Sequence, residues 1–137
     1  MLDKSLNKPA AGRAEQPLAR GVAAAALVAG AVIHLVDLPP SSILPVLNAL
    51  FIASAVGMLL GVVLLARPAP RLGWLIGGGT AFLTFLGYVV SRTTGLPGIV
   101  SAIGEWFYPL GIPSLIVEGI AFCLAAWALL TGPPRRG

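Results

Sequence analysis

Residues 43–66 read ILPVLNALFIASAVGMLLGVVLLA, an apolar stretch without a single Asp, Glu, Lys or Arg. A helix that crosses the hydrocarbon core of a bilayer needs about 20 such residues, because each residue adds about 1.5 Å along the helix axis. Further apolar stretches of similar length occupy residues 18–38, 72–90 and 113–130. Inside lipid, a chain satisfies its backbone hydrogen bonds within helices or closed barrels. The sequence therefore predicts an all-α fold, an antiparallel bundle of four transmembrane helices.

The composition agrees with a membrane protein. Hydrophobic residues make up 57% of the 137 residues and charged residues 10%, whereas soluble domains carry about 25% charged residues. We expect one transmembrane domain over residues 18–130, with short cytoplasmic tails at 1–17 and 131–137. The first tail mixes charged residues with Gly and Pro and lacks apolar periodicity, so we predict that it is flexible.

The net charge of +4 does not indicate a nucleic-acid partner, because the nine basic residues lie at helix ends and not in a stripe. Eight of them precede the first span, flank the connection between the second and third spans, or follow the fourth: Lys4, Lys8, Arg13, Arg20, Arg67, Arg71, Arg135 and Arg136. Basic residues favour the cytoplasmic side of a membrane. This pattern predicts a multi-pass membrane protein with both termini and the Arg67–Arg71 turn in the cytoplasm.

The connections between the spans differ in length. The first two are short and rich in proline, so each predicts a tight helical hairpin. The third, residues 91–112, is too long for a simple turn, and loops of this length are usually functional. Its second half could form a short interfacial helix or a packed cap over the outer mouth of the bundle, and the sequence leaves both open.

Small residues at intervals of four indicate where helices approach one another closely. Ala53, Gly57 and Gly61 form such a ladder on the second span, and Gly73 and Gly77 do so on the third. In lipid, close backbone approach supplies much of the packing between helices. We favour packing within the chain over homodimerisation, and the pattern alone does not decide between them.

Polar residues from separate spans gather at one depth in the predicted outer leaflet. They are His34, Asp37, Asn48, Tyr88, Arg92 and Glu118. An ionised carboxylate at the depth of Glu118 costs at least about 2.5 to 3.5 kcal/mol, so it should face the bundle interior and find a partner. Arg92 would make it a structural ion pair, whereas His34 would share a proton with it close to neutral pH. A protonated Glu118 bonded to a backbone carbonyl is the third alternative.

His34 and Asp37 are three residues apart and share a helical face, which is compatible with a metal site completed by Glu118. Haem with two axial histidines needs a symmetric dimer or a Met ligand, because the chain has one His. The sequence contains no recognisable nucleophile beside a base, CxxC pair or Gly-rich phosphate loop. Whether the protein is an enzyme is therefore uncertain, and we favour a protein without enzymatic activity.

Three functional hypotheses follow. The first is a non-enzymatic membrane protein that acts by association with lipid-embedded partners, as an accessory subunit of a larger complex or as a small homo-oligomer. The second is an outer-leaflet site for a metal ion, haem or a proton at His34, Asp37 and Glu118. The third is a small oligomeric transporter, which would need a polar path through both leaflets.

The segment YVVSRTTGLPG at residues 88–98 is the most distinctive string in the chain. Together with Glu105-Trp106 and PLGIPSLIVEG at residues 109–119, it resembles a group of small four-span membrane proteins of high-GC bacteria, actinobacteria especially. The resemblance covers residues 34 to about 127. It implies a four-span bundle with its characteristic residues at the outer face, and no catalytic role comes with it.

Overall fold

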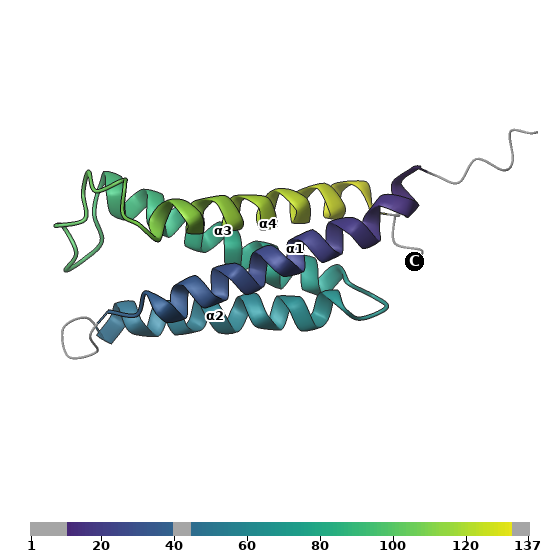
Figure 1. Cartoon of the computed structure of the whole chain (residues 1–137), viewed down its shortest axis with the longest axis horizontal. Coiled ribbons are helices and arrows are strands. Elements are labelled where there is room, and N and C mark those ends of the chain that lie inside the picture. The colour runs from purple at the N-terminus through teal and green to yellow at the C-terminus, as the bar shows by residue number, and fades with distance from the viewer. Residues whose placement is uncertain (1–10, 40–44, 133–137) are drawn as a thin grey trace, which may run out of the picture.

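The computed structural model describes residues 11–39 and 45–132 of the chain. These residues form four helices, α1 (Ala11–Val36), α2 (Pro45–Leu65), α3 (Arg71–Thr93) and α4 (Gly111–Thr131), and contain no β-strand (Figure 1). Each helix is long and apolar enough to cross a membrane. The predicted all-α fold of four transmembrane helices is confirmed.

Prolines mark the starts of α2 and α3, and the largest difference from the predicted spans lies at the start of α1. Pro45 occupies the first position of α2, where its missing N–H is not needed, and Pro70 directly precedes α3. α1 begins at Ala11 and not at Leu18, so residues 11–17 belong to the helix although Pro17 lies inside it. The remainder of the predicted tails, at residues 1–10 and 133–137, lies outside the described residues.

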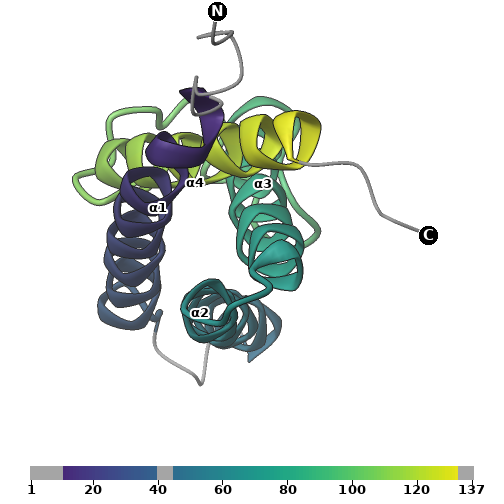
Figure 2. The same ribbon diagram turned by 90° about the vertical axis from the view of Figure 1, so that its right-hand side faces the viewer.

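The four helices form a square bundle when viewed along its axis (Figure 2). α1 packs against α2 and α4, α3 packs against the same two helices, and α1 and α3 lie on the diagonal. The turn between α2 and α3 lies at the same end as the start of α1 and the end of α4. We call the opposite end, which carries the loop of residues 94–110 between α3 and α4, the loop end.

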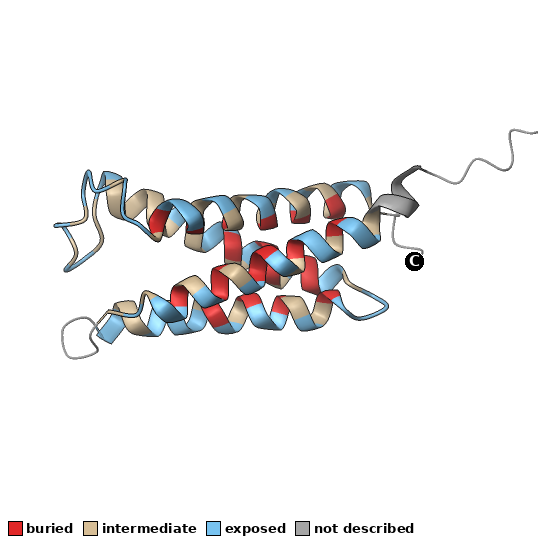
Figure 3. Ribbon diagram, viewed as in Figure 1, coloured by how far each residue is buried: buried red, intermediate tan, exposed pale blue. Residues whose placement is uncertain are grey.

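Small residues let the helices approach closely. A Cβ atom added at Gly61 would lie 2.5 Å from the Cα of Gly77, so α2 and α3 are in backbone contact. Gly57 faces Thr80, and Gly73 faces the backbone of Leu65. The predicted packing glycines thus face neighbours within the chain. Large apolar side chains cover the outer surfaces while the buried positions line the inward faces (Figure 3), as expected for a bundle surrounded by lipid.

The loop of residues 94–110 consists of turns, so the short interfacial helix, one of the two alternatives that the sequence left open, is not formed. Gly95, Gly98 and Gly104 have φ of 81°, 81° and 84°, values that favour glycine and interrupt a helix. Hydrogen bonds tie the loop to α3. The Gly104 N–H donates to the Arg92 carbonyl at 2.9 Å, the Tyr88 hydroxyl donates to the Trp106 carbonyl at 2.9 Å, and the Arg92 side chain donates to the Ala102 carbonyl at 3.3 Å. The loop is held on the end of α3 by these contacts.

Candidate binding cavity at the loop end

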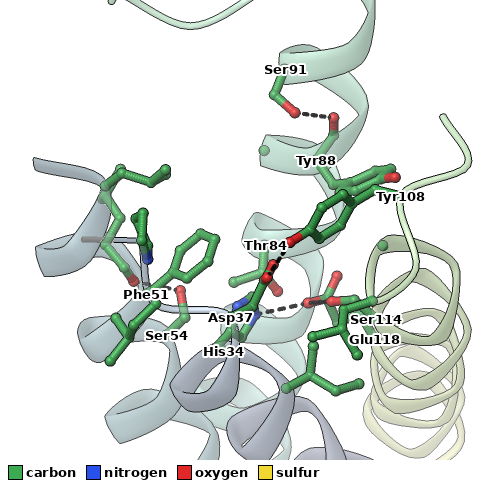
Figure 4. Close-up of a pocket in the computed structure, with 18 of the residues that line it drawn as sticks. His34, Asp37, Phe51, Ser54, Thr84, Tyr88, Ser91, Tyr108, Ser114 and Glu118 are labelled. Atoms are coloured by element: carbon green, nitrogen blue, oxygen red, sulfur yellow. Dashed lines mark hydrogen bonds and ion pairs between the residues drawn. The ribbon is translucent and has the colours of Figure 1, made fainter. Parts of the chain in front are cut away.

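A buried pair of side chains connects α1 and α4 near the loop end. His34 Nε2 and Glu118 Oε1 are hydrogen-bonded at 2.9 Å, and the Ser114 hydroxyl donates to the same oxygen at 2.7 Å (Figure 4). The Glu118 side chain is 1% exposed and that of His34 is 10% exposed. Glu118 Oε2 has no hydrogen-bond partner among the described residues. The partner of Glu118 is therefore His34, and the alternative ion pair with Arg92 is not formed.

Helical periodicity explains why both side chains point inward. On α1, Ala23, Leu27 and Ala31 are buried at intervals of four, and His34 continues this face one turn further along. On α4, Ser114, Glu118 and the buried alanines at 121, 125 and 128 lie on one face for the same reason. The two inward faces meet because α1 packs against α4.

Beside this pair lies a cavity of about 760 Å³ that is partly open to the surroundings and is lined by all four helices and the loop. This volume lies in the range of about 300–1,000 Å³ typical of small-molecule sites. Most of the wall is apolar, and the polar or ionisable side chains in it are His34, Asp37, Ser54, Thr80, Thr84, Tyr88, Ser91, Arg92, Tyr108, Ser114 and Glu118. Ser54 on α2 and Thr80 and Thr84 on α3 lie towards the middle of the bundle. Each of these hydroxyls donates to a carbonyl of its own helix. An apolar cavity with a few charged groups suits an amphipathic guest.

Arg92 lies at the end of α3 and reaches over aromatic rings. Its guanidinium carbon lies 4.6 Å from the centre of the Tyr88 ring and 5.9 Å from that of Tyr108. One guanidinium nitrogen donates to the Ala102 carbonyl at 3.3 Å. The Nε atom is buried without a hydrogen-bond partner, and within the described residues no carboxylate comes within ion-pair distance of Arg92. Arg92 therefore lies over two aromatic rings and has no acidic partner among the described residues.

Asp37 bonds to the loop and not to His34. Its carboxylate accepts a hydrogen bond of 2.7 Å from the Tyr108 hydroxyl (Figure 4). This hydrogen bond, the negative charge of Asp37 and burial raise the pKa of Tyr108, while the charge of Arg92 opposes them. The bond connects the end of α1 to the loop, so it helps to close one side of the cavity.

The structure brings together most of the predicted outer-leaflet residues. His34, Asp37, Tyr88, Arg92 and Glu118 all line the cavity, whereas Asn48 does not. Among the described residues, no group of three His, Cys, Asp or Glu side chains is placed to hold a metal ion, since Asp37 is turned towards Tyr108. The metal and haem hypotheses stay predictions.

Sequence reasoning did not identify Ser114 and Tyr108, the cavity side chains whose hydroxyls bond to the carboxylates of the predicted residues Glu118 and Asp37. Ser114 lies four residues before Glu118, the spacing at which two side chains meet on a helix, so this contact was readable from the sequence. Tyr108 carried no such signal, because its contact with Asp37 spans 71 residues of chain and depends on the turns of the loop.

The fold and the cavity together define a four-helix transmembrane bundle with a mostly apolar cavity at one end. Comparisons of this chain with protein-family models, with curated proteins and with solved structures found no match.

Proposed function

We propose that this protein is a small multi-pass protein of the bacterial cytoplasmic membrane that binds an amphipathic small molecule in its loop-end cavity, without catalysing a reaction. The observation that carries the proposal is the cavity of about 760 Å³ with a buried His34–Glu118 pair in its wall. The positions of Arg67 and Arg71 at the opposite end support an orientation with the loop end outside and both termini cytoplasmic.

The position of the cavity and its mostly apolar lining favour a guest that is dissolved in the membrane. Its wall is formed largely by the membrane-spanning helices and includes Leu50 on α2 and Leu83 on α3, residues that are 54% and 67% exposed. In the proposed orientation the cavity lies at the depth of the outer leaflet, where amphipathic molecules are dissolved. The apolar wall would hold the hydrocarbon part of such a guest, and the polar groups would orient its head.

The contacts of the polar groups support binding over catalysis. Glu118 is held by His34 and Ser114, and Asp37 by Tyr108. Each of these carboxylates is thus engaged in a fixed contact. The Ser114 hydroxyl donates to Glu118, but Ser114 is buried and His34 bonds to the carboxylate and not to this hydroxyl, so the three side chains do not form a serine–histidine–carboxylate relay. Proton binding at the His34–Glu118 pair stays a prediction within this reading, because a histidine and a carboxylate in contact are able to exchange a proton.

Association with other subunits, homo-oligomerisation and transport also stay predictions. The small-residue ladder no longer argues for association, since Gly57, Gly61 and Gly77 face neighbours within the bundle.

Two glycines of α3 provide a matched pair of variants for the test. A Cβ atom at Gly87 or at Gly79 would meet no heavy atom within 4 Å, so both positions accept a side chain. Gly87 lines the cavity, whereas Gly79 is exposed outside it. Gly87→Phe should fill part of the cavity, and Gly79→Phe should leave it empty.

The experiment is native mass spectrometry of the purified protein in mild detergent, followed by thermal unfolding with added amphiphiles. We expect the wild type and Gly79→Phe to retain a small amphipathic molecule, or to be stabilised by one, and Gly87→Phe to lose this binding while remaining folded. Equal binding by Gly79→Phe and Gly87→Phe, or no binding by the wild type, would contradict the proposed function.

A further inference from the structure

We propose that Arg92 is the headgroup site of the cavity and that it selects amphiphiles with an anionic head, a carboxylate or a phosphate, on an apolar chain. This inference rests on the proposed function and names the class of ligand that the cavity takes.

The first argument is the unused donor capacity of Arg92. A guanidinium carries five N–H donors and matches the two oxygens of a carboxylate or phosphate. In the described residues one donation, from Arg92 to the Ala102 carbonyl, is made, and the buried Nε has no partner. Arg92 lines the cavity, so the remaining N–H groups of its two terminal nitrogens are the donors available to an acceptor bound there.

The second argument is the charge balance along the cavity wall. Glu118 is bonded to His34 and Ser114, and Asp37 is bonded to Tyr108. Arg92 has no comparable acidic partner among the described residues. Its guanidinium carbon lies 4.6 Å from the centre of the Tyr88 ring, a cation–π contact that uses none of the N–H donors in a hydrogen bond to an acid.

The third argument is the length of the cavity. The Tyr88 ring packs directly against Gly111 at the start of α4, so Tyr88 and Gly111 lie at one level. Glu118 is seven residues further along α4, or about 10 Å deeper. A ligand whose head is bound at Arg92 would therefore place its apolar chain along the walls between Tyr88 and the His34–Glu118 pair. Both a free fatty acid and an anionic phospholipid of the outer leaflet present this chemistry.

The test compares two fluorescent probes of the same chain length, cis-parinaric acid and its uncharged methyl ester, binding to the purified protein in neutral detergent. We expect the acid to bind about 10-fold or more tighter than the ester, because the pairing with Arg92 is charge-assisted. Arg92→Gln should remove this difference, and Arg92→Lys should retain part of it. Arg71→Gln, a charge removal at the other end of α3, is the matched control and should leave the difference intact.

Displacement of the bound acid distinguishes the two sources. Displacement by oleate alone would identify a fatty-acid site, and displacement by phosphatidylglycerol as well would identify a phospholipid site; both results support an anionic headgroup at Arg92. If acid and ester bind the wild type equally well, or if Arg92→Gln retains the difference, the inference is overturned while the proposed function survives. If neither probe binds and no amphiphile copurifies with the protein, the proposed function fails with it.

Discussion

His34 on α1 and Glu118 on α4 are 84 residues apart in the chain and 2.9 Å apart in the bundle, joined by a buried hydrogen bond. The pair connects the first helix to the last, which closes the square of helices at the level of the cavity. Removing either side chain would leave the other buried group with fewer partners than it has now. The energetic contribution of the His34–Glu118 pair is therefore measurable as a coupling free energy between the two positions.

A double-mutant cycle of His34→Ala and Glu118→Ala tests this coupling. We expect each single change to lower the free energy of unfolding in detergent by about 1 to 3 kcal/mol, because a buried polar group loses its partner. The double variant should cost less than the sum of the two, with a coupling of about 0.5 to 3 kcal/mol. Leu35→Ala, on the exposed face beside His34, is the control and should show no coupling with Glu118→Ala. Strict additivity at His34 and Glu118 would contradict an energetic link between them.

The contact between α2 and α3 predicts a strong effect of one methyl group. Gly61→Ala would place a Cβ atom 2.5 Å from the Cα of Gly77, so the two backbones must separate. We expect a loss of about 1 to 3 kcal/mol in the free energy of unfolding, as for other overpacked cores. Gly21→Ala on α1, where a Cβ meets no neighbour within 4 Å, should leave stability unchanged or raise it slightly. Similar stabilities for the two variants would show that α2 and α3 are not in backbone contact.

The fold was predictable from the sequence, and so was more of the site than the depths of His34 and Glu118 along their helices. Depth along the helices placed His34 and Glu118 at one level, and the buried residues show that their rotation was also readable. Ala23, Leu27 and Ala31 precede His34 on one face of α1, and small residues flank Glu118 on one face of α4. A stripe of small residues marks the face that meets other helices, so a polar residue on that stripe is expected to point inward.

The rest depended on contacts that no local pattern encodes. Helical spacing did not choose between His34 and Arg92 as the partner of Glu118, because that choice depends on how far α3 lies from α4 at the loop end. The cavity itself is a gap between four helices, and its volume depends on how their side chains meet. The loop has a positive φ at Gly95, Gly98 and Gly104, and no local pattern in the sequence determines the path of the chain between these glycines.

The loop provides a prediction about pH. The hydrogen bond from Tyr108 to Asp37 raises the pKa of Tyr108. Because the folded value lies above the ordinary value of about 10, the bond contributes to stability below that pH and is lost as pH rises through the raised pKa. Asp37→Asn removes the negative charge and should lower the pKa of Tyr108 towards its ordinary value.

The measurement is an ultraviolet titration of phenolate absorbance. The chain has two tyrosines, so the curve of Tyr108→Phe is subtracted to isolate the Tyr108 transition. A Tyr108 transition that stays at the same pH in wild type and Asp37→Asn would show that the two side chains are not in contact.

The orientation in the membrane is tested with single cysteines at the two ends of the bundle. The exposed Cys123 on α4 is first replaced by Ala, which leaves a cysteine-free background. Val100 lies in the loop and is 70% exposed, and Ala69 lies in the exposed turn between α2 and α3, beside Arg67 and Arg71. Since basic residues favour the cytoplasmic side, we expect a membrane-impermeant maleimide to label Val100→Cys in intact cells and Ala69→Cys after permeabilisation only. The reverse pattern would place the cavity at the cytoplasmic end, and an anionic amphiphile would then have to come from the inner leaflet.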